Sequence, residues 1–427
     1  MKNILLKNVK VIDPRSAYHG KTTDIFICDG IIEKEVKPDS DIKEIDIPGL
    51  HVSNGWFDMQ ADFKDPGFEY KEDIESGSRA AAAGGFTGVA LLPTTYPVVD
   101  TKSQVEYLKR KSQGLPVQIF PMGAISEKCE GKELAELYDM SIAGAVAFTD
   151  GKNAVMDSDL LLRALMYSRR FGRLIITFPE DKYLSGKGHV NESGNTLLLG
   201  MKGSPALAEE LMIARDISLA ELAEAPIHFS TISTKGSVEL IRRAKKSGKE
   251  ITAGVAVHNL LLDDSMLSGF DSNYKVKPPL RSHEDVMALR VAVAEGVIDV
   301  IVSDHNPQND ESKVKEFELA DFGIIGAETC MAVAEKALKD YLSTEKIVEI
   351  FVVNPRKILN IEIPVIEEGK QANLSLFIPG SEWKFSDEDI FSKSGNTPFR
   401  GEGFNLRPIG IINRGEMFIA QDQKQKA

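Results

Sequence analysis

GWFDMQADFKDPG, residues 55–67, is the stretch that decides the fold. It begins as an apolar strand, Trp56–Met59, and continues with two polar residues, Gln60 and Asp62. Because alternate residues of a strand point to the same face, we expect both polar side chains on one face. The strand stops before the turn at Pro66-Gly67, which leaves the polar pair at its C-terminal end. Parallel α/β barrels carry their chemistry at that end.

From residue 53 onward, apolar runs of strand length alternate with amphipathic helical stretches. We expect strands at 56–62, 86–93, 117–123, 143–149, 173–179, 226–231, 250–256 and 298–304. We expect helices at 72–83, 160–171, 206–222, 237–247 and 284–295. Eight strands alternating with helices predict an α/β fold of the (β/α)8 TIM-barrel type over residues 53–365. A doubly wound fold would carry G-x-G-x-x-G after its first strand, and that motif is absent there.

The two ends of the chain have a different pattern. Residues 1–52 read as short strands joined by turns such as Asp13-Pro14 and Asp29-Gly30. Strand character returns after about residue 366. We therefore predict that 1–52 and 366–427 pair into a small composite β-sandwich domain beside the barrel.

Composition limits the kind of protein. The 427 residues carry a net charge of -13, which argues against nucleic acid or an anionic membrane as partner. The three cysteines are far apart, so neither a disulfide framework nor a thiolate zinc site is indicated. No apolar run approaches the ~18 residues of a membrane span, and the apolar run at the start is too short for a signal peptide. We expect a soluble cytoplasmic protein.

Several long sequence blocks occur in a fixed order along the chain. They are 65–74 (DPGFEYKEDI), 79–87 (RAAAAGGFT), 233–238 (STKGSV), 278–281 (PPLR), 322–326 (FGIIG), 354–356 (NPR) and 396–399 (NTPF). Through these blocks the chain resembles dihydroorotase of the amidohydrolase superfamily over essentially its full length. The resemblance implies a metal-dependent barrel with a β-sandwich that hydrolyses a cyclic amide in pyrimidine synthesis.

The resemblance also implies metal ligands at the strand ends, four of which are histidines in the family. Those four positions hold Gln60, Asp62, Phe178 and Thr231 in this chain. Zinc generates hydroxide near neutral pH when imidazoles hold it, and a phenyl ring cannot bind a metal. We therefore expect no metal, and zinc only if the family activity is retained.

Two carboxylates remain at family ligand positions. Asp304 matches the strand-eight aspartate that is ligand and general base, so it would be the catalytic residue of an active enzyme. Asp150 matches the metal-bridging aspartate of strand four, where Gly151 replaces a second aspartate.

The positions that hold substrate in the family are mostly altered as well. Lys64 replaces an arginine that grips the substrate carboxylate, and so lacks the bidentate fork. Thr94 and Lys277 each replace an asparagine. His305 is retained within the family's Asp-His-Ala-Pro-His block, which reads Asp-His-Asn-Pro-Gln at 304–308 here.

Each of these residues also has a purely structural interpretation. Asp304 is either a general base or a buried carboxylate that accepts backbone hydrogen bonds. His305 and His258 are either ligands of a rearranged site or hydrogen-bonded structural residues.

The strand-end carboxylates as a group allow two arrangements. One is a site for magnesium or calcium built from Asp62, Asp150, Glu180 and Asp304. The other, which we favour, is an ion-pair cluster in which Lys64 and Lys277 neutralise the carboxylates.

These observations favour a dihydroorotase-like protein that is catalytically degenerate. The resemblance implies that such a protein acts as a structural or regulatory partner of aspartate transcarbamoylase, and that its assembly is a homodimer. The alternative is an active metal-dependent cyclic amidohydrolase with a rebuilt site. It would be a dihydroorotase converting carbamoyl aspartate and dihydroorotate, or an allantoinase- or hydantoinase-like enzyme. A third possibility is a binding module that keeps a small ligand in the altered pocket.

Overall fold

Eight short parallel strands form the barrel of the computed structural model, which describes residues 3–34 and 42–424. They are β6 (Trp56–Ala61), β7 (Phe86–Leu91), β8 (Gln118–Pro121), β9 (Ala147–Phe148), β10 (Leu174–Thr177), β13 (Ile227–Phe229), β14 (Ile251–Ala256) and β15 (Val300–Val302). Hydrogen bonds link β6-β7-β8 and, separately, β9-β10-β13-β14-β15. Parallel bridges from Gly123 to Phe148 and from Ala61 to His305 join the two groups and close the ring. The eight predicted strands and the TIM-barrel fold are confirmed.

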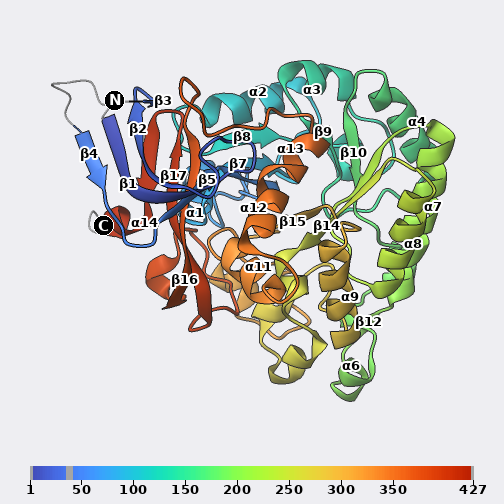
Figure 1. The fold of residues 1–427 in the computed structure, drawn as a ribbon. Coiled ribbons are helices and arrows are strands. Elements are labelled where there is room, and N and C mark those ends of the chain that lie inside the picture. The colour runs from blue at the N-terminus through green and yellow to red at the C-terminus, as the bar shows by residue number, and fades with distance from the viewer. Residues whose placement is uncertain (1–2, 35–41, 425–427) are drawn as a thin grey trace.

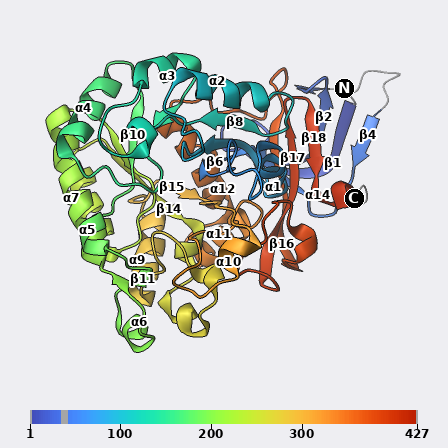
Figure 2. The same ribbon diagram turned by 180° about the vertical axis from the view of Figure 1, so that it is seen from behind.

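Helices surround the strands (Figures 1 and 2). The five predicted helices appear as α1 (Ile74–Ala83), α4 (Ser158–Arg169), α7 (Ala206–Ala223), α8 (Lys235–Lys246) and α9 (His283–Ala294). Four further helices are α2 (Lys102–Lys111), α3 (Leu137–Ala143), α11 (Cys330–Leu338) and α12 (Thr344–Val352). Side chains at helical spacing on α7, including Met212, Ile213 and Ile217, are buried against the barrel.

Shorter elements lie in the connections and, in the case of α14, after the last strand. They are α5 (Lys182–Ser185), β11 (Val190–Asn191), α6 (Gly194–Leu198), β12 (Gly203–Ser204), α10 (Asp310–Lys313), α13 (Asn354–Ile358), α14 (Ala420–Lys424), and the 3-10 turns η1 (Glu127–Cys129), η2 (Val257–Leu260), η3 (Asp264–Gly269), η4 (Ser272–Tyr274) and η5 (Asp387–Asp389). No helix within the described ranges has both the length and the apolar character needed to cross a bilayer.

Strands from the two ends of the chain lie in one sheet beside the barrel (Figure 1). They are β1 (Asn3–Ile12), β2 (Thr22–Cys28), β3 (Ile31–Glu33), β4 (Ile42–Ile45), β5 (His51–Asn54), β16 (Asn373–Lys384), β17 (Gly403–Asn413) and β18 (Glu416–Ile419). Antiparallel pairing of β5 with β16 joins the N-terminal strands to the C-terminal ones, as predicted. The domain boundary predicted at 52/53 falls inside β5 and stays a prediction.

Inside the barrel, on the N-terminal side of the strand ends that carry the polar residues, the side chains are apolar. One buried cluster takes its side chains from strands around the ring, including Phe57, Met59, Leu174 and Ile176. On β10 the side chain of Ile175 belongs instead to the core that includes the helices. This alternation continues past the strand, so Phe178 follows Leu174 and Ile176 toward the barrel axis.

Candidate functional site at the strand ends

All six positions that the resemblance assigns to metal ligands are buried at the C-terminal ends of barrel strands. Their exposed fractions are 6% or less for Gln60, Asp62, Asp150, Phe178, Thr231 and Asp304. Gln60 lies on β6, and the others follow their strands by one or two residues. The barrel therefore gathers these side chains at one end, as the sequence pattern predicts.

Asp304 is the centre of a hydrogen-bonded cluster. Its Oδ1 accepts a hydrogen bond of 2.7 Å from Nε2 of Gln60. The Nζ atom of Lys152 lies 2.8 Å from Oδ1 and 2.9 Å from Oδ2 of Asp304. The same ammonium donates to the carbonyl oxygen of Lys277 at 2.6 Å and lies 3.5 Å from Oγ1 of Thr231. Asp304 is thus a buried carboxylate with an internal counter-ion.

Phe178 fills the space beside this cluster. The Nζ atoms of Lys152 and Lys277 lie 5.3 Å and 5.4 Å from the centre of its ring. A cation within about 6 Å of an aromatic face is attracted to it. Lys277 also pairs with Glu180 at 2.6 Å. The Phe178 ring therefore packs against two ammonium groups.

Asp62 has a partner of its own. Its Oδ2 lies 2.6 Å from Nζ of Lys64, and its Oδ1 accepts a hydrogen bond of 2.9 Å from the Lys64 backbone nitrogen. Gln60 and Asp62 thus contact different partners, one at the end of the neighbouring strand β15 and one in the turn that follows β6. Together with the pair between Lys277 and Glu180, this confirms the predicted neutralisation of carboxylates by Lys64 and Lys277.

Asp150 supports the neighbouring loop. Its Oδ1 accepts hydrogen bonds from the backbone nitrogens of Ile125 at 2.8 Å and Ser126 at 3.0 Å, and its Oδ2 accepts one from the Ser126 hydroxyl. Burial raises the pKa of the Asp150 carboxyl, while these hydrogen bonds act in the opposite direction. Both carboxylate oxygens are therefore used to hold the 125–126 segment.

The residues present do not fit a zinc ion. A zinc centre in this fold needs several nitrogen, sulfur or carboxylate donors directed at one point. Here Phe178 offers no donor, and Asp62 and Asp304 are each bound to a lysine ammonium. Across residues 3–34 and 42–424, no three His, Cys, Asp or Glu side chains are grouped so that they could hold a metal ion. The magnesium or calcium site considered above lacks support for the same reason.

The remaining substrate positions are also occupied by protein contacts. Nδ1 of His305 accepts hydrogen bonds of 3.2 Å from the backbone nitrogens of Gly326 and Ala327, and its Nε2 lies 3.4 Å from Glu72. Because Nδ1 accepts, Nε2 carries the proton and donates to Glu72. Thr94 packs tightly against Gly151, where an added Cβ would lie 2.7 Å from its Cγ2. His305 is thus held by structural hydrogen bonds.

His258, on η2, is buried beside the cluster. Neither of its ring nitrogens has a hydrogen-bond partner among the described residues. Burial lowers the pKa of His258 to about 4, while the nearby Asp304 carboxylate raises it and the Lys152 ammonium lowers it further. The imidazole is therefore neutral near pH 7.

A cleft of about 280 Å³ opens beside the cluster. Its lining includes Glu180, Lys277, Lys187, His189 and Phe322. This is the place where a small ligand would reach the altered site, and ligand retention stays a prediction.

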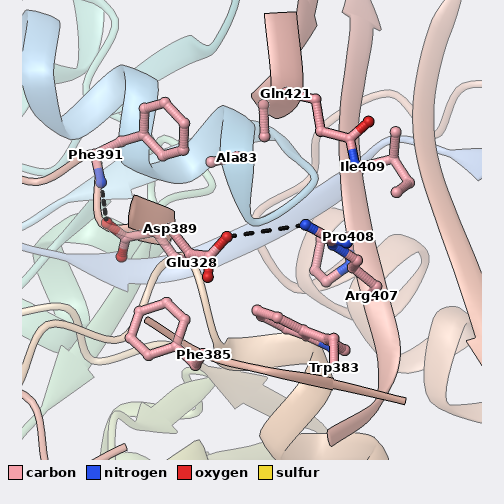
Figure 3. Close-up of a pocket in the computed structure, with 11 residues that line it drawn as sticks. Ala83, Glu328, Trp383, Phe385, Asp389, Phe391, Arg407, Pro408, Ile409 and Gln421 are labelled. Atoms are coloured by element: carbon pink, nitrogen blue, oxygen red, sulfur yellow. Dashed lines mark hydrogen bonds and ion pairs between the residues drawn. The ribbon is translucent and has the colours of Figure 1, made fainter. Parts of the chain in front are cut away.

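A second, smaller cavity lies between the barrel and the terminal sheet (Figure 3). Here the Phe391 backbone nitrogen donates to Glu328 at 3.2 Å, and Arg407 lies 4.0 Å from Asp389. Trp383 forms part of its wall. The strand-end residues do not line this cavity, so it is separate from the candidate site.

Lys152 is the site residue that sequence reasoning missed. It follows Asp150 and Gly151, two positions that the resemblance had singled out. A lysine two residues after a position that the resemblance assigns to a metal ligand was the available signal. Its partner Asp304 is 152 positions away in sequence, so only barrel closure brings them together.

The chain matches two family models. One is described as dihydro-orotase-like and matches residues 50–237, and the other is the amidohydrolase family, which matches residues 182–417. The dihydroorotase of Geotalea daltonii is 40% identical over 426 residues, which cover 98% of this chain and 100% of that protein. The dihydroorotase of Ruminiclostridium cellulolyticum is 41% identical and covers 93% of this chain and 94% of that protein.

Solved structures of similar fold are more distant in sequence. The L-hydantoinase of Arthrobacter aurescens has a TM-score of 0.83 at 22% identity, covering 98% of this chain and 96% of that one. The D-hydantoinase of a Thermus species has a TM-score of 0.80 at 22% identity, covering 97% and 95%. These neighbours share the barrel and its adjoining β-rich domain.

Proposed function

The chain belongs to the dihydroorotase-like amidohydrolase family, and from this premise we propose that it is a family member whose strand-end site no longer performs metal-dependent hydrolysis. The observation that carries the proposal is the bonding of Asp304. In the family reaction, as the resemblance implies, this aspartate helps to hold the metal and moves a proton. Here its two oxygens are bonded to the Lys152 ammonium and the Gln60 amide.

This bonding restricts both properties that the chemistry requires. A general base must offer a free lone pair within hydrogen-bond reach of the proton that it abstracts. Water activation also needs a Lewis acid, and the donor set around Phe178 and Thr231 does not fit one.

We further propose that the protein acts as a structural or regulatory partner of aspartate transcarbamoylase, in a homodimeric form. The proposal rests on the pattern of change along the chain. The long sequence blocks that carry the resemblance and the whole barrel are present, while the four strand-end positions where the resemblance implies histidine hold Gln60, Asp62, Phe178 and Thr231. Such a pattern fits a protein that is needed for its surface and shape.

The second candidate is an active dihydroorotase, and the names of the relatives favour it over the first. Relatives about 40% identical over nearly the full chain carry that name. This candidate requires metal ligands other than the six family positions. The hydantoinase structures do not add a substrate to it, because at 22% identity they support the fold alone.

One experiment separates the candidates. The protein is purified without chelator, its metal content is measured by elemental analysis, and both directions of the dihydroorotase reaction are assayed with and without added zinc. The Geotalea daltonii enzyme serves as the positive control. We expect no zinc-dependent turnover, and turnover that rises with bound zinc would overturn the proposal in favour of the second candidate.

The partner proposal has its own measurement. The chain is mixed with the aspartate transcarbamoylase of the same organism, and the mass of the complex is measured by size-exclusion chromatography with light scattering. A complex of defined stoichiometry is expected. Separate elution at concentrations well above those in cells would contradict this part.

A further inference from the structure

The Lys152 ammonium occupies a distinctive place in the barrel. Its contacts come from three of the six family ligand positions: the carboxylate of Asp304, the hydroxyl of Thr231 and the ring face of Phe178. A fourth position, Gln60, shares the same Asp304 oxygen. The positive charge therefore sits where these strand ends converge.

Resting on the proposed function, we infer that Lys152 is a built-in cation that takes the place of the metal ion and holds the strand ends together. Its ammonium has three hydrogens to donate, and the acceptors around it are two carboxylate oxygens, the Lys277 carbonyl and the Thr231 hydroxyl. All four are oxygens, the ligand type that surrounds a bound cation.

Local backbone geometry directs Lys152 inward. Gly151 has φ +63°, in the left-handed region that glycine adopts at little cost. A Cβ at this position would lie 2.7 Å from Thr94, so the turn also requires the small residue. The chain therefore turns sharply after Asp150. The side chain of Lys152, which follows Gly151, then reaches Asp304 across the barrel.

The charges of the site balance in pairs. Asp304, Asp62 and Glu180 are each matched by one lysine, at distances of 2.8, 2.6 and 2.6 Å. A buried carboxylate without a counter-ion would repel its neighbours and destabilise the fold. Lys152 has only one fifth of its side chain exposed and Asp304 only 7%, so solvent screens this pair weakly.

A double-mutant cycle with chemical rescue tests the inference on the full-length protein. The variants are Lys152→Ala, Asp304→Leu and the double variant, each followed by thermal unfolding. We expect a melting temperature several degrees lower for Lys152→Ala, with much of the loss recovered in the double variant, because removing both charges leaves none unpaired. Lys187→Ala, which removes a cleft lysine, is the charge-matched control and should change little.

Cation rescue distinguishes this role from ordinary packing. Alkylammonium ions should raise the melting temperature of Lys152→Ala, and should do so much less in the wild type and in the double variant. Equal melting temperatures for wild type and Lys152→Ala, or equal rescue in the double variant, would overturn the inference. Hydrolysis by the wild type would instead overturn the proposed function, so the two failures are distinguishable.

Discussion

Nζ of Lys152 lies within 2.9 Å of both carboxylate oxygens of Asp304, although 152 positions of sequence separate the two residues. The contact joins the end of β9 to the end of β15 across the barrel. Breaking such a buried pair strongly destabilises the fold, because removal of one partner leaves the other charged and desolvated. The relationship explains how the end of β15 can bury a carboxylate, because the Lys152 ammonium is its counter-ion.

Restoring the histidines will not restore a zinc site while Lys152 remains. We expect the variant Gln60→His, Asp62→His, Phe178→His, Thr231→His to bind zinc weakly, because the Lys152 ammonium blocks Asp304 and repels the ion. Adding Lys152→Ala should tighten zinc binding by ~100-fold or more, since even a unit-charge repulsion near 4 Å is worth ~4 kcal/mol at an effective dielectric of 20, which is ~1,000-fold in affinity, and zinc carries two charges. Competition with a chromophoric chelator measures both affinities.

The matched control adds Lys187→Ala to the same four-histidine variant. It removes one lysine charge from the cleft and leaves Asp304 paired. Equal zinc affinity with and without Lys152 would show that the ammonium does not compete with a metal.

Breaking the pair between Asp62 and Lys64 should destabilise the protein. Asp62→Asn keeps the shape of the side chain but leaves the Lys64 ammonium without a counter-ion at 11% exposure. We expect a loss of about 3 kcal/mol, as for other buried pairs that lose one partner. The control is Asp159→Asn, which breaks an exposed pair with Arg163 on α4 and should cost less than ~0.5 kcal/mol. Thermal unfolding of both variants gives the comparison, and a larger shift for Asp159→Asn would contradict it.

The fold could be predicted from the sequence because each barrel strand is a short apolar run between helical segments. The clearest difference is at residues 143–149, where the structure has only Ala147–Phe148 as strand. The apolar run there begins inside α3, which ends at Gly144 with φ +113°. A helix end and a following strand merge into one apolar run, so periodicity alone places the strand too early.

Contacts within the site could be predicted where the two residues are near each other in sequence, or where a group of carboxylates implies a basic counter-ion. Lys64 and Lys277 could be proposed as counter-ions, and both pair with carboxylates. Lys152 could not, because its orientation depends on the turn at Gly151 and on closure of the barrel. The anchoring of Asp150 by the 125–126 segment also depends on a loop whose path leaves no sequence pattern.

Gly84 should not tolerate a side chain. It ends α1, and an added Cβ would lie 2.0 Å from the Ala327 carbonyl oxygen. Since its φ of -75° suits any residue, the cost of Gly84→Ala comes from this contact alone, and we expect about 1–3 kcal/mol of destabilisation. Gly194→Ala on α6 is the matched control, because no heavy atom lies within 4 Å of its added Cβ. The melting temperatures of the two variants test the prediction. It fails if Gly84→Ala and Gly194→Ala have the same melting temperature.

His258 should make the protein sensitive to acid. Burial lowers its pKa in the folded state from 6.5 to about 4. Above pH 6.5 the imidazole is neutral in both states and has no effect on the pH dependence. Below that pH the unfolded chain takes up a proton and the folded one does not until about pH 4, so stability falls across this window. The loss contributed by this group amounts to roughly 3 kcal/mol between pH 7 and pH 4.

Other buried groups titrate in the same range, so a difference between two proteins isolates the effect of His258. Burial raises the pKa of Asp58 and of Asp216 to about 6, and each of these carboxyls favours the folded state as the pH falls. His258→Gln leaves them in place and removes only the imidazole. The stability of the wild type minus that of His258→Gln, measured by denaturant unfolding from pH 7 to pH 4, should therefore decrease steadily as the pH is lowered. A difference that stays constant over this range would mean that the folded protein protonates His258 as readily as the unfolded chain does.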